Sequence, residues 1–361
     1  MEIFKSTSSE FLVNLLNNLK CSLIFSTYQS GCAVIISAND RNLIQITRGF
    51  KKPMGIAINK DKLALATLDE LIIFSNKNDL NKSYPKKPNV YDSIYMPRSS
   101  YFTGNLDLHD IAFGNSNEIY AVNTRFSCIS KIDSDFSFKP IWKPAFISKI
   151  LPEDRCHLNG MALLNGYPKF ATALSQTDFK GGWRDNITKS GVLIDTKKNE
   201  IILENLGMPH SPRIINNELY LLQSSKGEVI KVNTKEKSYK TVARVPGMLR
   251  GMTEYGNYVF IGVSKPRKRS KTFSKLPKEF QKQSAGIIVF YKPNWSLVGE
   301  IKYSTTVNEI YDLQILPNIL RPNILNRDKL MENDGIVTNN LSIWYKKHKL
   351  AKKESKNVKN K

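Results

Sequence analysis

The chain has 361 residues, of which 41% are hydrophobic and 10% aromatic, a composition typical of a folded protein rather than a disordered one. It contains no apolar run approaching the ~20 residues that a membrane-spanning helix needs. The net charge of +22 is concentrated in two segments, 264–283 and 346–361, each with eight Lys or Arg residues and one glutamate. Such clusters can bind nucleic acid or an anionic membrane. Neither segment interleaves aromatic residues as single-strand binders do, so we favour a solvated loop and a solvated tail.

The N-terminal sequence lacks the basic leader, the long apolar core and the cleavage site of a signal peptide. Ser8 and Ser9 precede the amphipathic run EFLVNLLNNL, which predicts a short capped helix within residues 1–20. The cysteines show neither CxxC pairing nor metal-ligand spacing, so free buried thiols in a cytoplasmic protein are the simplest interpretation. These cysteines are Cys21, Cys32, Cys128 and Cys156.

Six segments share one pattern, in which a polar or special residue and then usually a small residue lead into a short apolar strand. They are PMGIAI from Pro53, LHDIAF from Leu108, LNGMAL from Leu158, PHSPRII from Pro209, LRGM from Leu249 and NEIYDLQIL from Asn308. Their alignment gives one equivalent position per repeat, occupied by Met54, His109, Asn159, His210, Arg250 and Glu309. The repeats lie 40–59 residues apart, the spacing of four-stranded propeller blades.

Strand-like runs rich in Val, Ile, Tyr and Phe follow each of the first five segments, with turn residues between them. Only one such run follows the sixth segment, whereas three precede the first: CSLIFSTY, CAVIISAN and NLIQITR. Three strands plus one complete a sixth blade, and a ring closed in this way leaves no open sheet edge. We therefore predict an all-β, six-bladed β-propeller over residues 21–320, followed by an extended basic tail over 321–361.

The aligned residues are expected around the mouth of the central tunnel, because the innermost strands begin there. The turns joining the second and third strands of each blade reach the same face. Three of the four histidines, His109, His157 and His210, fall at or beside inner-strand starts. A single histidine is more often a structural residue, but polar groups that converge on one tunnel predict a binding site.

Candidate ligand-binding residues come from the inner-strand starts and from the long turn TDFKGGWRD of the third repeat. Arg250 suits a carboxylate or phosphate, which a guanidinium binds through two parallel hydrogen bonds. Trp183 suits stacking on a sugar or aromatic ring, or equally caps the hydrophobic edge of its blade. The full set is His109, Asp110, Asn159, Asp178, Trp183, Arg184, His210, Arg213, Arg250 and Glu309.

A divalent metal is the alternative cofactor for this site. His109, His210 and Glu309 carry the imidazole and carboxylate groups that zinc, iron or manganese prefer. In that case Asn159 orients water or substrate, and Asp110 acts as a base behind the ligands. Arg250 argues against a metal, because a fixed cation beside the ion is electrostatically costly. Glu309 and Arg250 also suit a purely structural ion pair.

The motifs STYQSG, PMGIAI, HLNGMAL, TDFKGGWR, MPHSPR, LRGM, GVSKPR and NEIYDLQILP together resemble a bacterial family of conserved hypothetical proteins. That family carries a domain of unknown function, and the resemblance spans about residues 10–320. It implies a propeller and brings no established activity. More distantly, the architecture looks like the gluconolactonase and strictosidine-synthase-like propellers, which hold calcium in the tunnel. Asn159 and Glu309 match the residue types of that calcium site, whereas His109, His210 and Arg250 depart from them.

Three functions therefore stay open for the chain. The first is a propeller that binds a small anionic or sugar-containing molecule at the tunnel mouth. The second is a metal-dependent hydrolase or lyase, and the third is a platform for a protein partner; nucleic acid is the less favoured partner. The basic segment 264–283 is expected to project between two strands of blade five on the tunnel-mouth face. Its inner residues, Lys265 and Arg267, would lie near the tunnel, and its outer part would be mobile.

Overall fold

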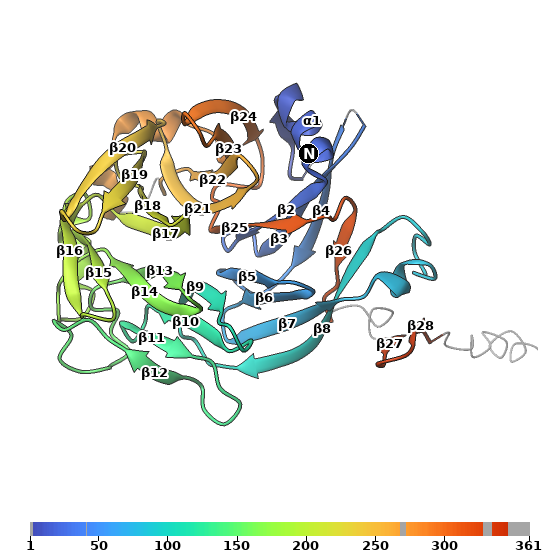
Figure 1. Ribbon diagram of the computed structural model, residues 1–361, viewed down its shortest axis with the longest axis horizontal. Helices are drawn as coiled ribbons and strands as arrows, with labels where there is room; N and C mark the ends of the chain where they lie inside the picture. Colours follow the sequence, from blue (N-terminus) through green and yellow to red (C-terminus); the bar gives the residue numbers. More distant parts are fainter. Residues whose placement is uncertain (1–2, 41, 268–271, 328–333, 346–361) are drawn as a thin grey trace, which may run out of the picture.

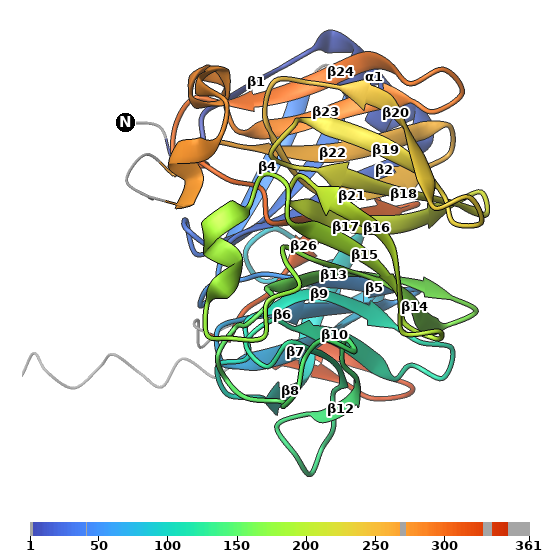
Figure 2. The same cartoon turned by 90° about the vertical axis from the view of Figure 1, so that its left-hand side faces the viewer.

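Six β-sheets surround a common axis in the computed structural model, which describes residues 3–40, 42–267, 272–327 and 334–345 (Figure 1). Each blade has four antiparallel strands in up-and-down order, and two of the sheets gain a fifth short strand at the outer edge. The first strand of each blade lies beside the first strand of the next. Figure 2, turned by 90°, shows neighbouring sheets packed face to face. This arrangement confirms the predicted six-bladed β-propeller.

The first three blades follow one another along the chain. Blade one comprises β5 (Ile56–Asn59), β6 (Lys62–Ala66), β7 (Glu70–Asn76) and β8 (Ser93–Phe102). Blade two comprises β9 (Leu108–Phe113), β10 (Ile119–Asn123), β11 (Cys128–Lys131) and β12 (Lys139–Trp142). Blade three comprises β13 (Leu158–Leu164), β14 (Tyr167–Ala173), β15 (Gly191–Asp195) and β16 (Glu200–Leu206).

The remaining blades complete the ring. Blade four comprises β17 (Pro209–Ile215), β18 (Glu218–Gln223), β19 (Glu228–Asn233) and β20 (Ser238–Arg244). Blade five comprises β21 (Met248–Tyr255), β22 (Tyr258–Ser264), β23 (Gly286–Tyr291) and β24 (Ser296–Tyr303). Blade six comprises β25 (Asp312–Pro317), β2 (Cys21–Thr27), β3 (Cys32–Asn39) and β4 (Asn42–Gly49).

Blade six joins the two ends of the chain. Strand β25 pairs antiparallel with β2, from Cys21 opposite Pro317 to Ser26 opposite Asp312. Strand β2 continues into β3 and β4, so this sheet combines one C-terminal strand with three N-terminal strands. The main-chain hydrogen bonds between β25 and β2 therefore hold the ring shut.

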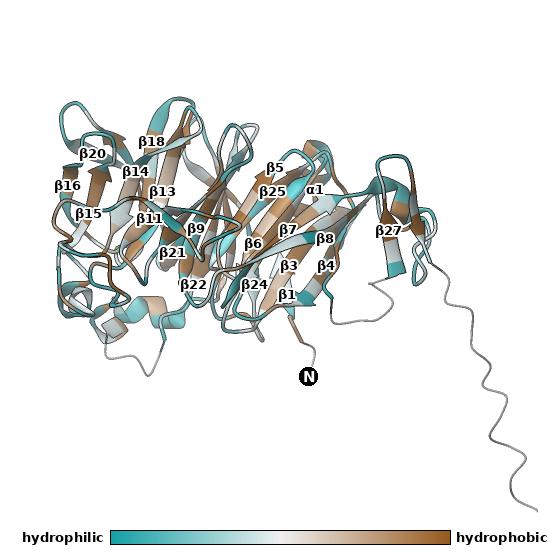
Figure 3. Cartoon of the chain, turned by 90° about the horizontal axis from the view of Figure 1, so that it is seen from below, coloured by the Kyte–Doolittle hydropathy of each residue, from teal (hydrophilic) through white to brown (hydrophobic). Residues whose placement is uncertain are grey.

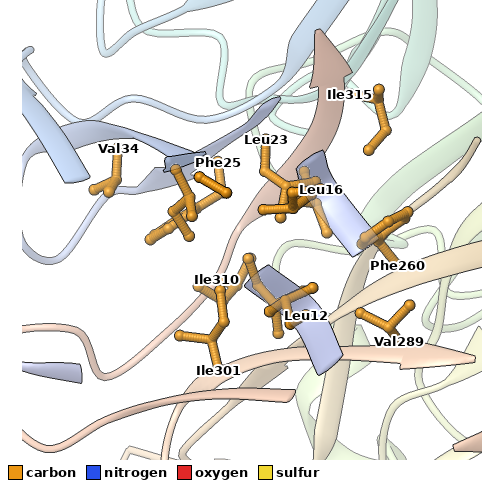
Figure 4. Packing of buried hydrophobic residues seen from close by; sticks show 14 of the residues in the cluster. Leu12, Leu16, Leu23, Phe25, Val34, Phe260, Val289, Ile301, Ile310 and Ile315 are labelled. Atoms are coloured by element: carbon orange, nitrogen blue, oxygen red, sulfur yellow. The ribbon is translucent and has the colours of Figure 1, made fainter. Parts of the chain in front are cut away.

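Hydrophobic side chains fill the space between adjacent sheets. Figure 3 shows mainly hydrophobic residues along the strands and mainly hydrophilic ones in the connecting turns. Helix α1 (Glu10–Leu19) covers the junction of blades five and six, where Leu12 and Leu16 pack with Phe260 and Leu23 (Figure 4). Burying each leucine stabilises the fold by roughly 2 kcal/mol. None of the helices in the described ranges is long and apolar enough to cross a membrane.

Both ends of the chain carry short strands that the sequence did not predict. Helix α1 coincides with the predicted run EFLVNLLNNL, but its N-cap residue Ser9 makes no side-chain capping bond. Before it, β1 (Ser6–Ser8) pairs with the outer edge of β24. Beyond residue 321, β26 (Pro322–Ile324) pairs in parallel with the outer edge of β8, so the described part of this region is not an extended tail. Unpaired outer edges of two blades accept these short strands.

A hairpin outside the ring also differs from the predicted extended tail. Strands β27 (Gly335–Val337) and β28 (Ser342–Trp344) pair with each other, and Trp344 is buried. The Trp344 indole N–H donates to the main-chain oxygen of Leu80 at 2.8 Å, and its ring lies 5.2 Å from that of Tyr84. Residues 328–333 and 346–361 of the predicted tail lie outside the described residues.

Two changes compare how the hairpin and residues 346–361 contribute to stability. We expect removal of 346–361 to leave the melting temperature unchanged. Trp344→Ala should lower the free energy of unfolding by about 2–4 kcal/mol, because it deletes a buried aromatic ring and leaves a cavity. Urea unfolding of the full chain, the truncated chain and the alanine variant tests both statements. A truncation as destabilising as Trp344→Ala would contradict the first.

Candidate functional site

The predicted inner-strand residues gather at one end of the tunnel. His109, Asn159 and His210 lie near the starts of β9, β13 and β17, and all three are buried. The side chain of Arg250, on β21, is close enough to lower the pKa of both histidines by charge repulsion. Residues from successive blades thus meet, as the sequence predicted.

In blade six the inner position belongs to a residue that the sequence alignment missed. In three blades, a hydroxyl at the end of the second strand donates to the carbonyl just before the inner position of the next blade. These bonds run from Thr124 to Leu158, from Ser224 to Leu249 and from Ser264 to Ile310. The residue after Ile310 is Tyr311, so Tyr311 and not Glu309 is equivalent to Asn159 and Arg250. A two-residue shift preserves the alternation of a strand, which is why the pattern did not reveal the error.

His109 and His210 are held by the same pair of hydrogen bonds. Nδ1 of His109 lies 3.0 Å from the carbonyl oxygen of Asp107 and 2.8 Å from the hydroxyl of Thr124. Nδ1 of His210 lies 3.0 Å from the carbonyl oxygen of Met208 and 2.9 Å from the hydroxyl of Ser224. A carbonyl only accepts, so Nδ1 carries the proton in both rings. Burial lowers the pKa of both imidazoles well below the ordinary value, which leaves them neutral with Nε2 as an acceptor.

His157 and Trp183 form a stacked pair anchored by Asp154. Nδ1 of His157 lies 3.0 Å from both carboxylate oxygens of Asp154, and the Trp183 indole N–H donates to the same carboxylate at 2.8 Å. The two ring centroids are 4.1 Å apart, and the His157 ring is 4.8 Å from that of His109. Trp183 is only 7% exposed. It therefore positions His157, and its burial favours the second of the two roles predicted for it, a cap on the hydrophobic edge of its blade, over an open stacking platform.

Arg250 stacks on Tyr311 at the tunnel mouth. Its guanidinium carbon lies 3.6 Å from the centroid of the Tyr311 ring, which is 5.3 Å from the Tyr28 ring. Four buried polar atoms of this region find no hydrogen-bond partner within the described residues: Arg250 Nη2, Asn159 Nδ2, Tyr311 OH and Tyr28 OH. Buried polar atoms without partners are costly, so these atoms are available to a ligand.

Glu309 lies beside this group. Its carboxylate accepts the main-chain N–H of Gln29 at 2.9 Å. Burial raises the pKa of Glu309 to about 7, and the positive charges of Arg250 and Arg267 oppose the rise. The carboxyl group is therefore close to half protonated at neutral pH.

The predicted metal set is not supported by the geometry. No three His, Cys, Asp or Glu side chains among the described residues are arranged to hold a metal ion. His109 and His210 lie on inner strands, whereas the Glu309 carboxylate bonds to the turn after β2. Tyr311 and the cationic Arg250 occupy the adjacent positions instead.

Arg213 and Asp110, two further predicted ligand residues, bind each other inside the ring. Arg213 donates through Nη1 to Asp110 Oδ2 at 2.8 Å and through Nη2 to Asp110 Oδ1 at 3.2 Å. It also donates to the carbonyl oxygens of Met161 and Met252, and lies 3.7 Å from Asp312. Burial raises the pKa of Asp312 to about 6, although Arg213 opposes the rise. These residues tie the inner strands together and leave little for a ligand.

The other two predicted polar residues also point elsewhere. Asp178 pairs with the Arg155 guanidinium at 2.6 Å and accepts the main-chain N–H of Ser148 at 3.1 Å, so it braces the loop. Arg184 is exposed, with its guanidinium carbon 4.3 Å from the Trp183 ring centroid. Asp178 thus braces the loop of blade three, and Arg184 packs on Trp183.

The basic insertion of blade five lies on the tunnel-mouth face, as predicted, but its outer part is packed. Its short helices η3 (Thr272–Lys275) and η4 (Lys278–Lys282) lie on the same side of the ring as helix η2 (Gly182–Asn186) in Figure 2. Phe280, 1% exposed, joins Trp183 in one hydrophobic cluster. Residues 268–271 of the predicted loop lie outside the described residues.

Beneath this insertion lies a cavity of about 40 Å³. His157, His210, Ser224 and Arg250 supply its polar lining, and Trp183 and Phe273 are among its apolar walls. The guanidinium of Arg267, at the inner end of the insertion, lies 5.0 Å from the Tyr28 ring. The cavity and the unpartnered polar atoms together form the candidate site.

These features define a six-bladed β-propeller with an enclosed polar site at one end of its tunnel. The chain belongs to the DUF4915 family, a domain of unknown function, whose family model matches residues 10–325. No curated protein matches its sequence. A chain in the crystal structure of a nidogen/laminin complex is similar to it, with a TM-score of 0.53 at 10% identity, covering 82% of this chain and 99% of that chain. At that identity, the likeness shows the fold alone.

Replacing Arg213 tests its structural role. Arg213→Met should lower the free energy of unfolding by about 3–5 kcal/mol, because it leaves the buried Asp110 and Asp312 without their cation. Adding Asp110→Asn should recover part of that loss. Urea unfolding measures both effects, with Arg98→Met, an exposed arginine on β8, as the matched control. An Arg213→Met variant as stable as this control would refute the assignment.

The raised pKa of Glu309 predicts a pH-dependent stability. The folded chain keeps this proton up to about pH 7, whereas the unfolded chain loses it near 4.5, so the free energy of unfolding falls as the pH rises between these values. Glu309→Gln keeps the acceptor for Gln29 and removes the charge. We expect no gain at pH 4 and a gain on the order of 1–3 kcal/mol at pH 8. Denaturant unfolding at several pH values measures this difference. A variant less stable than the wild type at pH 8 would contradict the prediction.

Proposed function

We propose that the mouth of the tunnel binds a small anionic molecule. The observation that carries this proposal is Arg250 Nη2, a buried cationic donor without a partner in the described chain, at the wall of a cavity. The described residues that line this cavity include no carboxylate. A guanidinium in such surroundings favours a carboxylate or phosphate group.

The surrounding charges support an anion. Arg267 and Lys52 lie over the Tyr28 ring, with their charged atoms 5.0 and 5.9 Å from its centroid. Lys52 is paired with Asp107 at 2.7 Å, whereas Glu309 is close to half neutral at pH 7. The mouth therefore carries excess positive charge, which attracts anions over a Debye length of ~10 Å at 0.1 M salt.

The other candidate functions have less support. The metal-dependent hydrolase loses its predicted ligand set, and a sugar that needs an open aromatic ring meets a buried Trp183. Wider hollows lie between blades three and four and between blades one and six, and none of these polar atoms lines them. A protein partner, a cytoplasmic location, a bacterial origin and a relation to the gluconolactonase-like propellers stay predictions.

Substitution of Arg250 tests the proposal. We expect inorganic phosphate or short carboxylates to raise the melting temperature of the wild type, because a ligand that binds only the folded state stabilises it. Arg250→Gln should weaken binding at least tenfold by removing the charge, about 1.4 kcal/mol or more. Arg98→Gln, an exposed arginine on β8, should bind like the wild type. Equal binding by Arg250→Gln, or no stabilisation of the wild type by any anion, would overturn the proposal.

A further inference from the structure

Three histidines at the mouth share one protonation pattern. Nδ1 of His109 and of His210 meets a carbonyl oxygen at 3.0 Å, and Nδ1 of His157 meets the Asp154 carboxylate at 3.0 Å. Each of these partners accepts, so Nδ1 is the protonated nitrogen in every ring. In the neutral ring Nε2 is then an acceptor, and no hydrogen bond to any of the three Nε2 atoms occurs within the described residues.

Two of these acceptors share a cavity with the unpartnered donor. His157, His210 and Arg250 all line the 40 Å³ space beneath the blade-five insertion. At this volume the space admits only a short ligand. A ligand that satisfies this lining needs an anionic group for Arg250 and, one or two bonds away, a donor for an imidazole Nε2.

A hydroxyl group fits this donor role better than an ammonium group. An imidazole accepts from either, but Arg250 is close enough to repel a second cation strongly in a buried site. Arg267 adds to the positive field, and Asp154 is already bonded to His157, Trp183 and, at 3.8 Å, Arg184. A neutral donor avoids this repulsion.

We propose that the cavity receives a two- or three-carbon hydroxycarboxylate, with its carboxylate on Arg250 and its hydroxyl donating to Nε2 of His210. The assignment rests on the proposed anion site and narrows it to one ligand class. A site built around a hydroxyl discriminates against the analogue that lacks it, because the analogue buries an acceptor without a partner.

Three acids of one skeleton test the ligand class: propionate, lactate and alanine carry hydrogen, hydroxyl and ammonium on the same carbon. Calorimetric titration of the full chain should show lactate, as one of its enantiomers, binding about tenfold more tightly than propionate. Alanine should bind more weakly than lactate. Equal affinities of lactate and propionate, or alanine binding most tightly, would overturn the hydroxycarboxylate assignment while leaving an anion site in place.

A double variant tests the role of the imidazoles. The side-chain amide of asparagine reproduces the Nδ1 donor of histidine and lacks Nε2, so His157→Asn/His210→Asn keeps the bonds to Asp154 and Met208. We expect this variant to lose the preference for lactate over propionate. Tyr239→Phe, which removes an exposed hydroxyl on blade four, should keep the preference. A preference that survives the double variant would refute the imidazole contact.

The two proposals fail in different ways. If none of the three acids and no phosphate binds to the folded wild type, the anion site itself is wrong. If propionate and lactate bind equally and Arg250→Gln abolishes both, the anion site stands and the hydroxyl contact is wrong. Circular dichroism and melting curves of each variant identify a variant that does not fold, and the wild-type comparison of the three acids needs no variant at all.

Discussion

One guanidinium holds the centre of the ring. Arg213, on blade four, bonds to Asp110 of blade two and to carbonyl oxygens of blades three and five, and lies beside Asp312 of blade six. Asp110 in turn accepts the main-chain N–H of Met161, and Asp312 that of Ile56. One cation between two carboxylates thus links inner strands from all six blades. Buried charges are stable only with such complete pairing, so the position of each inner strand depends on the others.

The site is built on these fixed strands. The inner strands of blades two to six each place one side chain at the tunnel mouth, and hydroxyls of Thr124 and Ser224 connect neighbouring blades while fixing the His109 and His210 rings. The loop of blade three and the insertion of blade five then cover His157 through Trp183 and Phe280. Rigid strands therefore set the distances between the polar groups, and two loops exclude water from them.

The fold could be predicted from the sequence because six short motifs at blade spacing are compatible with few folds besides a propeller. The same motifs located His109, Asn159, His210 and Arg250 correctly. The roles of individual side chains depended on contacts between residues far apart in the chain. Arg213 faces Asp110 across 103 residues, and Trp183 is covered by an insertion about 90 residues later, so neither burial was visible locally. Tyr311 was missed because a strand shifted by two residues keeps its pattern.

Closure of the ring between β2 and β25 has a consequence for synthesis. The ribosome releases β2, β3 and β4 before the strands of the other blades, and about 260 residues separate the end of β4 at Gly49 from the start of their inner neighbour β25 at Asp312. Pairing between strands so far apart in sequence is slow. Strands β2, β3 and β4 therefore keep exposed apolar faces and an unpaired strand edge until β25 has been synthesised. Strand β2 is buried throughout its length in the finished ring. The nascent chain therefore depends on protection of its first strands until its last blade emerges, whether by helix α1 or by a chaperone.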